Sequence, residues 1–260
     1  GIYASSDITN VDGTVVAKKG TLIEKATTGT DGKAKFNVDL PLGFSYEVKE
    51  EQAPTGYVRN TEDVYTFALS YTNDKEAKQT FKHTFKNERV TAKISLQKQD
   101  KETKKAVSQG DATLEKAVYG LYAREDIVHP DGATGVVYKA GEQVATLTTD
   151  KNGQASVDGL YLGNYYVKEI SPSVGYLADE TEHDLVCNYE GDLVAEVKRD
   201  CLSLEQVMKQ PFEIIKAANN GKTDADLLKG AGFTAYLVSS LTVKEDGSYD
   251  FGSAKPVVIG

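Results

Sequence analysis

The sequence is poor in the residues and patterns that metal, redox and nucleic-acid sites require. It has no Trp, one Met, two Cys and three His among 260 residues. The histidines are scattered without metal-ligand spacing and the cysteines form no CxxC pair, so we expect neither a metal centre nor a cofactor. The net charge of −9 argues against nucleic acid as a partner, because phosphate binding needs a basic surface. No apolar run approaches the roughly 18 residues of a membrane-spanning helix.

Helical periodicity is also scarce, and the composition favours strands and turns instead. The chain holds 15 Tyr and 23 Gly, together with many Thr and Val. Its length suits two ordinary domains or three small ones. The chain begins abruptly at Gly1-Ile2-Tyr3 and shows no signal peptide or wall-sorting segment, so we expect it to be an internal part of a longer protein.

An internal repeat of about 120 residues organises the chain. Gly1-Ile2-Tyr3-Ala4 recurs 119 residues later as Gly120-Leu121-Tyr122-Ala123. Asp-Gly and Asn-Gly pairs between short alternating runs are hairpin signals, so the repeat predicts an all-β chain of tandem β-sandwich modules. Further matches follow in the same order: Asp12-Gly13 with Asp131-Gly132, Leu40-Pro41-Leu42-Gly43 with Leu160-Tyr161-Leu162-Gly163, and Pro54-x-Gly56-Tyr57 with Pro172-x-x-Gly175-Tyr176.

Incomplete repeats set the expected module boundaries. A strand ending at Lys98 precedes the Gly-x-Tyr-Ala strand of the second repeat, and a similar strand ending at Lys216 opens a third. The first repeat has no such strand. We therefore predict a first module at 1–90 that lacks its first strand, a complete second module at 91–209, and the N-terminal part of a third module at 210–260.

Two glutamates fall on the apolar faces of predicted strands. With the two-residue period of a strand, Glu50 shares a face with Tyr46 and Val48, and Glu169 shares one with Tyr165 and Val167. Burying a carboxylate without a partner costs several kcal/mol or forces it to take up a proton. A strand-end glutamate that escapes to solvent is the simpler interpretation, but its recurrence in both repeats favours a buried role.

The same period places other polar groups inward. Lys98 follows Ile94 and Leu96 on one face, Lys216 ends the corresponding strand, and Asn87 closes the first module on an apolar face. A desolvated lysine becomes a nucleophile, and a desolvated carboxyl keeps its proton and can polarise an amide. The three residue types therefore suit a covalent Lys–Asn isopeptide bond. A buried Lys–Glu ion pair with a nearby hydrogen-bonded Asn fits the same pattern.

The order of motifs resembles that of the Cna B-type domains, which include the SpaA-type pilin modules of Gram-positive surface proteins. The resemblance rests on Leu96-x-Lys98-x-Asp100, then Gly-x-Tyr-Ala, Leu-x-x-Gly-x-Tyr-x-x-x-Glu and Pro-x-Gly-Tyr. It implies prealbumin-like, Ig-like sandwiches in which a first-strand Lys bonds to a last-strand Asn or Asp, assisted by a Glu. By position, the resemblance makes Glu50 and Glu169 the assisting carboxyls, Lys98 and Lys216 the amines, and Asn87 the amide.

The second module departs from this pattern in its closing strand, residues 193–200, which carries no Asn. Asp200 is the acceptor that the resemblance suggests. However, Leu193, Ala195, Val197 and Arg199 form the apolar side of that strand, so Asp200 would need a bulge to turn inward.

The two cysteines, Cys187 and Cys201, lie on either side of a turn at 188–192 and suggest adjacent strands of a hairpin. A disulfide between them would suit an exported protein and add roughly 3 kcal/mol in the chain-entropy model. Two buried free thiols fit the sequence equally well.

These features and the resemblance predict a structural stalk segment of a bacterial adhesin or pilin-like protein, extracellular and anchored to a Gram-positive cell wall. Its partners would be neighbouring modules, other pilin subunits or the host extracellular matrix. The alternative is a host matrix- or glycan-binding module that uses the loops 101–116 and 71–79. No loop presents a paired acid and base or a nucleophile motif, so we expect no enzyme beyond single-turnover self-crosslinking.

Overall fold

The computed structural model describes residues 1–73, 79–210, 212–219, 227–236, 242–244, 247–250 and 252. These residues form strands and turns and no helix, so the all-β prediction is confirmed. In this described part, no helix is long and apolar enough to cross a membrane. The chain divides into two compact units, Gly1–Met208 and Lys209–Gly260. The predicted module boundaries, at residues 90/91 and 209/210, stay a prediction.

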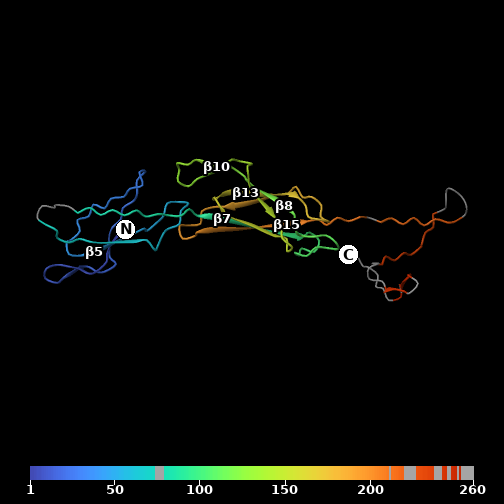
Figure 1. Cartoon of the computed structure of the whole chain (residues 1–260), viewed down its shortest axis with the longest axis horizontal. Helices are drawn as coiled ribbons and strands as arrows, with labels where there is room; N and C mark the ends of the chain where they lie inside the picture. Colours follow the sequence, from blue (N-terminus) through green and yellow to red (C-terminus); the bar gives the residue numbers. More distant parts are fainter. Residues whose placement is uncertain are drawn as a thin grey trace. The chain divides into compact units, whose positions relative to one another are not determined.

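The second module is a two-sheet sandwich (Figure 1). Antiparallel pairing builds the larger sheet in the order β11-β8-β13-β14, and the smaller sheet has the order β12-β7-β15. A short hairpin, β9 (Ile127–Val128) and β10 (Val136–Tyr138), lies outside both. The larger sheet contains β8 (Val118–Ala123), β11 (Gln143–Thr148), β13 (Gly163–Ser171) and β14 (Glu182–Cys187), and the smaller contains β7 (Thr91–Asp100), β12 (Gln154–Leu160) and β15 (Glu196–Glu205).

The central strand of the smaller sheet, β7, has buried and half-buried residues in strict alternation along its whole length. Its inward side chains include Ile94 and Leu96, which pack with Leu121 and Tyr165 of the opposite sheet in one continuous core. It pairs antiparallel with β12 and parallel with β15. Because β15 ends the module, its first and last strands lie side by side.

The described residues of the first module form one sheet of comparable size. Its sheet has the order β4-β1-β5-β6, and a two-stranded pair β2-β3 stands beside it. The buried core is small, comprising Ile2, Ala4, Ile8 and Tyr46. The strands are β1 (Ile2–Ala4), β2 (Ile8–Thr9), β3 (Val15–Ala17), β4 (Leu22–Glu24), β5 (Ser45–Lys49) and β6 (Val64–Ala68).

Residues 33–40 and 79–88 of the first module correspond by the repeat to β12 and β15, yet they form no strand. In the second module both of those strands hydrogen-bond to β7. No strand occupies that central place among the described residues of the first module. Without a common neighbour, the two segments have no backbone partners with which to form a ladder.

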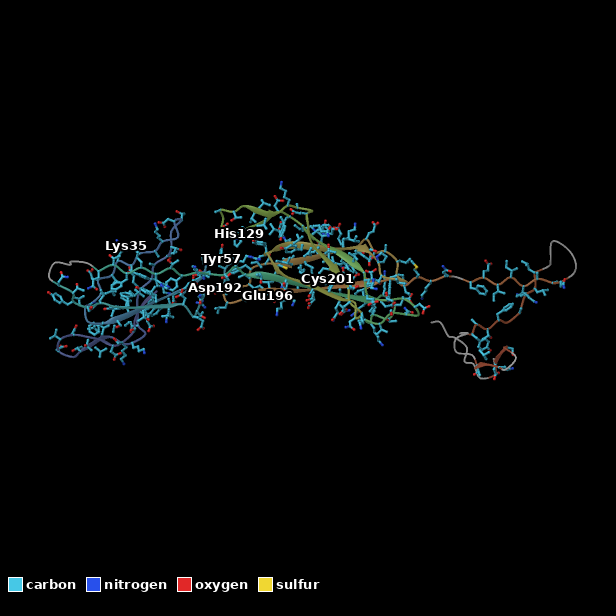
Figure 2. All side chains as sticks on the ribbon, viewed as in Figure 1. Lys35, Tyr57, His129, Asp192, Glu196 and Cys201 are labelled. Atoms are coloured by element: carbon cyan, nitrogen blue, oxygen red, sulfur yellow. The ribbon has the colours of Figure 1, made fainter. Side chains whose placement is uncertain are left out.

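The first and second modules meet at a junction of specific polar contacts around Tyr57 and Asp192 (Figure 2). Within the first module, Tyr57 forms an isolated β-bridge with Arg89. Across the junction, the backbone N–H of Ala53 donates to Asp192 Oδ2 at 3.0 Å. Arg59 Nε lies 3.6 Å from the same carboxylate oxygen. The junction is therefore more than a flexible linker.

The unit Lys209–Gly260 contains the short pair β16 (Thr242–Val243) and β17 (Tyr249–Asp250) among its described residues. The opening strand that the sequence predicts, ending at Lys216, does not form among the described residues. An isolated β-bridge joins Ala217 to Leu227. Lys216 is exposed, as are Phe212 and Ile214. The inward-facing arrangement that the sequence predicts for this lysine is thus not formed here.

Candidate functional site

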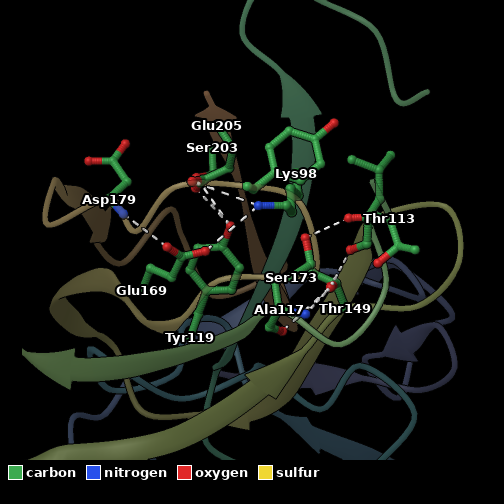
Figure 3. Close-up of polar contacts among 12 residues, drawn as sticks. Lys98, Thr113, Ala117, Tyr119, Thr149, Glu169, Ser173, Asp179, Ser203 and Glu205 are labelled. Carbon is green, nitrogen blue, oxygen red and sulfur yellow. Dashed lines mark hydrogen bonds and ion pairs between the residues drawn. The ribbon is translucent and has the colours of Figure 1, made fainter. Parts of the chain in front are cut away.

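The inner face of the second module contains a lysine between two glutamates (Figure 3). Lys98 Nζ lies 3.7 Å from Glu169 Oε1 and 3.7 Å from Glu205 Oε2. The Lys98 and Glu205 side chains are fully buried, and that of Glu169 is 2% exposed. The structure therefore brings the predicted pair Lys98 and Glu169 together, and adds a third ionisable group.

Strand alternation explains how these side chains meet. Lys98 follows Leu96 on the inner face of β7, and Glu169 follows Val167 on the inner face of β13. On β15, Cys201, Ser203 and Glu205 are all buried. The parallel register sets Ser203 opposite Lys98, so Glu205, two residues further on, projects beside the lysine.

Two hydroxyl groups hold one oxygen of Glu205. Tyr119 donates to Glu205 Oε1 at 3.0 Å, and the Ser203 hydroxyl donates to the same oxygen at 2.5 Å (Figure 3). Tyr119, on β8, is itself fully buried. The contacts orient the carboxyl group so that its other oxygen, Oε2, faces Lys98.

Glu169 is oriented in a similar way. The backbone N–H of Asp179 donates to Glu169 Oε2 at 2.9 Å, which leaves Oε1 facing the lysine. The ring of Tyr176 covers Lys98, with Nζ 4.5 Å from its centroid. Among the described residues, Lys98 Nζ, Glu169 Oε1 and Glu205 Oε2 all lack a hydrogen-bond partner. Buried polar atoms of folded proteins seldom stay unpaired, so the three together mark an unusual site.

Burial shifts the proton equilibria of Lys98 and Glu169 toward their neutral forms. Desolvation lowers the pKa of Lys98 from 10.5, against the attraction of Glu205 and Glu169. Desolvation likewise raises the pKa of Glu169 from 4.5. A neutral amine beside a protonated carboxyl can act as a nucleophile with a proton donor, whereas an ammonium ion cannot attack.

Comparison with known proteins identifies the fold family. The model of the SpaA prealbumin-like fold domain matches residues 4–85 and again 92–200. The chain belongs to this family. The resemblance to SpaA-type modules is thereby confirmed, and each matched segment lies within one predicted module. No curated protein matches the chain.

Solved structures similar to this SpaA-family chain include pilins. The Bacillus anthracis TIE protein is 23% identical, with a TM-score of 0.42 over 70% of this chain and 28% of that one. GBS52, the minor pilin of Streptococcus agalactiae, is 20% identical, with a TM-score of 0.31 over 75% of this chain and 73% of that one. The shaft pilin SpaA of Lactobacillus rhamnosus GG is 16% identical, with a TM-score of 0.31 over 81% and 84%.

Asp200, the acceptor suggested by the sequence, is not brought to Lys98. It pairs with Ser95 in the β7–β15 ladder and its side chain is exposed, because β15 contains no bulge that would turn it inward. Glu205 is a site residue that the sequence pattern did not predict. The sequence nevertheless contains a signal for it. Asn87 lies eleven residues before Lys98, and Glu205 lies eleven residues before Lys216, so the two residues occupy matching places relative to the next lysine.

In the first module, the structure brings Asn87 and Glu50 together. Asn87 Nδ2 donates to Glu50 Oε2 at 2.6 Å and to the Val58 carbonyl at 2.8 Å. The backbone N–H of Asn60 also donates to Glu50 Oε2, at 3.2 Å. The lysine ion pairs seen in the described part of this module involve Glu51 and Asp31 rather than Glu50. The amide and carboxyl of the predicted site are thus assembled without an amine.

The cysteines do not lie on one hairpin, contrary to the prediction. Cys187 ends β14, which pairs with β13, whereas Cys201 lies on β15, which pairs with β7 in the other sheet. The turn after β14 carries the chain across the sandwich instead of back along the same sheet. Both thiols are free and buried. Desolvation raises the pKa of Cys187, and it raises that of Cys201 to about 11.

Proposed function

We propose that the chain is a structural stalk segment of a Gram-positive surface protein, pilin-like or adhesive, whose SpaA-family modules are joined in series and stabilised by intramolecular isopeptide bonds. The observation that carries the proposal is the buried Lys98–Glu169 pair inside a complete sandwich of this family. Family membership and the pilins among similar structures support a structural role outside the cell.

The topology of the second module suits a tensile role. The chain enters at β7 and leaves at β15, and these strands run parallel in register from Thr91 to Asp100 and from Glu196 to Glu205. Tension between the two ends therefore shears the whole ladder and loads its hydrogen bonds together. A covalent bond near Lys98 would carry the load directly from the first strand to the last and shield residues between them.

The junction supports the same role. Arg89, at the end of the first module, donates to the second-module carbonyls of Leu160 at 2.9 Å and Gly159 at 2.6 Å. Its guanidinium lies 4.0 Å from the centroid of the Tyr161 ring. Together with the Asp192 contacts, this arrangement fixes how the chain enters the module. Fixed connections are what a stalk needs to hold its tip away from the wall.

The loop 101–116, which the sequence offers as a ligand-binding candidate, is tied to the module at its start. Asp100 accepts hydrogen bonds from the backbone N–H groups of Glu102 at 3.0 Å and Thr103 at 2.9 Å, and from the Gln109 amide at 3.0 Å. These contacts fit a structural connection, and they favour the stalk over a ligand-binding loop. Part of the other candidate loop, 71–79, lies outside the described residues.

Immunogold electron microscopy of the source bacterium tests the role. Antibodies against residues 1–208 should label intact cells, with gold particles displaced outward from the wall. Label that appears only after the cells are broken open would contradict the proposal.

A further inference from the structure

We propose that Lys98 and Glu205 form a side-chain amide bond, with Glu169 as the proton-transfer group. The inference rests on the proposed function and names the acceptor of its crosslink. It departs from the Asn or Asp acceptor that the family resemblance implies, because the side chain at this place is a glutamate.

The internal repeat places Glu205 at the acceptor position. Asn87 closes the last segment of the first module and contacts Glu50, and Glu205 closes β15 of the second module and lies in the same site as Glu169. The two closing residues also keep the same distance in sequence from the lysine that follows them. Glu205 therefore takes the position of the acceptor amide.

Lys98 and Glu205 are buried, and their facing atoms make no hydrogen bonds in the described part of the chain. The attacking atom, Lys98 Nζ, lies 3.7 Å from Glu205 Oε2, the oxygen that would leave. Neither atom has a hydrogen-bond partner among the described residues. As ions, they would sit in a core that solvates them poorly. Amide formation replaces both with a neutral group, so the buried charge disappears.

The environment of Glu205 Oε1 suits attack at the carbonyl carbon of Glu205. Tyr119 and Ser203 aim their hydroxyl groups at this oxygen. When an amine attacks the Glu205 carbonyl carbon, negative charge develops on the oxygen that stays attached, and donors already in place stabilise it. Oε2, which faces the lysine, is the oxygen that leaves.

The step balances with the residues present. The neutral Lys98 amine attacks Cδ of protonated Glu205 and forms the C–N bond. Protonated Glu169 gives its proton to Oε2, which departs as water when its C–O bond breaks, and takes a proton from Nζ in return. Glu169 ends in its starting state, and no oxidant or other reactant is needed. Packing holds the amine against the carbonyl, which supplies the proximity that a bimolecular reaction lacks.

Intact-mass spectrometry of the full chain under denaturing conditions tests the proposal. We expect a mass lower than that of the sequence by one water, and a branched peptide joining Lys98 to Glu205 after proteolysis. Folded protein with the full mass would overturn the amide. Such a result would also remove the isopeptide bond of the second module from the proposed function. The stalk role itself would still be tested by the microscopy, which does not depend on the crosslink.

Three variants sharpen the test. Glu169→Gln removes the proton carrier, and the full mass should return. Glu205→Gln should yield the same linkage with loss of one ammonia instead of one water. Asp200→Ala is the matched control on the outer face of β15, and it should keep the loss of one water. Loss of the linkage in Asp200→Ala, with the variant still folded by circular dichroism, would overturn Glu205 as the acceptor.

Discussion

Lys98 and Glu205 lie on neighbouring parallel strands with Nζ and Oε2 3.7 Å apart, both fully buried. Their strands are the first and last of the second module, so the contact joins the place where the chain enters to the place where it leaves. The contact can be probed through the residues around it.

Tyr119→Phe should destabilise the second module by about 1–3 kcal/mol, because it removes a buried donor to Glu205 Oε1. It should also slow formation of the amide, since it removes one stabilising donor. Urea denaturation and a mass time course after refolding measure the two effects.

The matched control for that variant is Tyr166→Phe. Tyr166 is half-buried, and its ring stacks on Tyr122 with centroids 5.1 Å apart, away from the lysine. A phenylalanine keeps that stacking, so both stability and rate should change little. Equal effects of the two variants would argue against a special role for Tyr119.

Gly153→Ala should destabilise the second module more than Gly132→Ala. Both glycines have left-handed backbones, with φ of 73° and 69°, so each alanine meets a strain of about 1–2 kcal/mol. A Cβ at Gly153 would also lie 2.7 Å from the Lys98 carbonyl oxygen, whereas one at Gly132 meets nothing within 4 Å. Thermal melts of the two variants compare these costs. Equal shifts in Tm would show that the protein accommodates the added Cβ at Gly153 beside β7 without further loss of stability.

Both cysteines should resist thiol reagents in the native protein. The thiols are buried, and burial raises the pKa of Cys201 from 9.0 to about 11, which lowers its thiolate fraction near neutral pH about a hundredfold. Labelling with an iodoacetamide probe should modify neither cysteine until urea unfolds the module, and then both. Unfolded protein that takes up label only after reduction would show that a disulfide had formed.

Asp192→Ala should loosen the junction between the first and second modules. The variant removes the acceptor for Ala53 N–H and the ion pair with Arg59, both partly buried, at a cost of about 1–3 kcal/mol. In scanning calorimetry, the first module should melt at lower temperature and separately from the second. Asp184→Ala, which breaks only exposed contacts to Arg124, is the control and should change Tm little.

Stability should fall in acid through Asp100. Burial raises the pKa of this carboxyl, but hydrogen bonds from Thr103, Gln109, Tyr176 and Glu102 outweigh burial and lower the pKa below 3.8. A lowered carboxyl pKa gives stability that is present above 3.8 and is lost as the pH falls through the folded value. Denaturation curves between pH 5 and about 2 should show this loss, and Asp100→Asn should flatten it. An unchanged slope in the variant would assign the acid sensitivity to other groups.

The sequence by itself determined the all-β class, the repeat and the inward direction of several polar side chains. Strand alternation is a local property, so Lys98 and Glu169 could be placed on apolar faces from their neighbours alone. The same reasoning predicted that Asn87 and Glu50 face inward, and the two side chains do meet, although neither residue lies within a strand of the structure.

Only the tertiary structure decided which groups share a site. The parallel register of β15 on β7 sets Ser203 opposite Lys98 and leaves Asp200 facing solvent, and strand register between distant segments depends on the packing of both sheets. The same holds for the cysteines, whose strands lie in opposite sheets although a short turn separates them. Alternation fixes the side of a strand on which a residue lies, and packing fixes what it meets there.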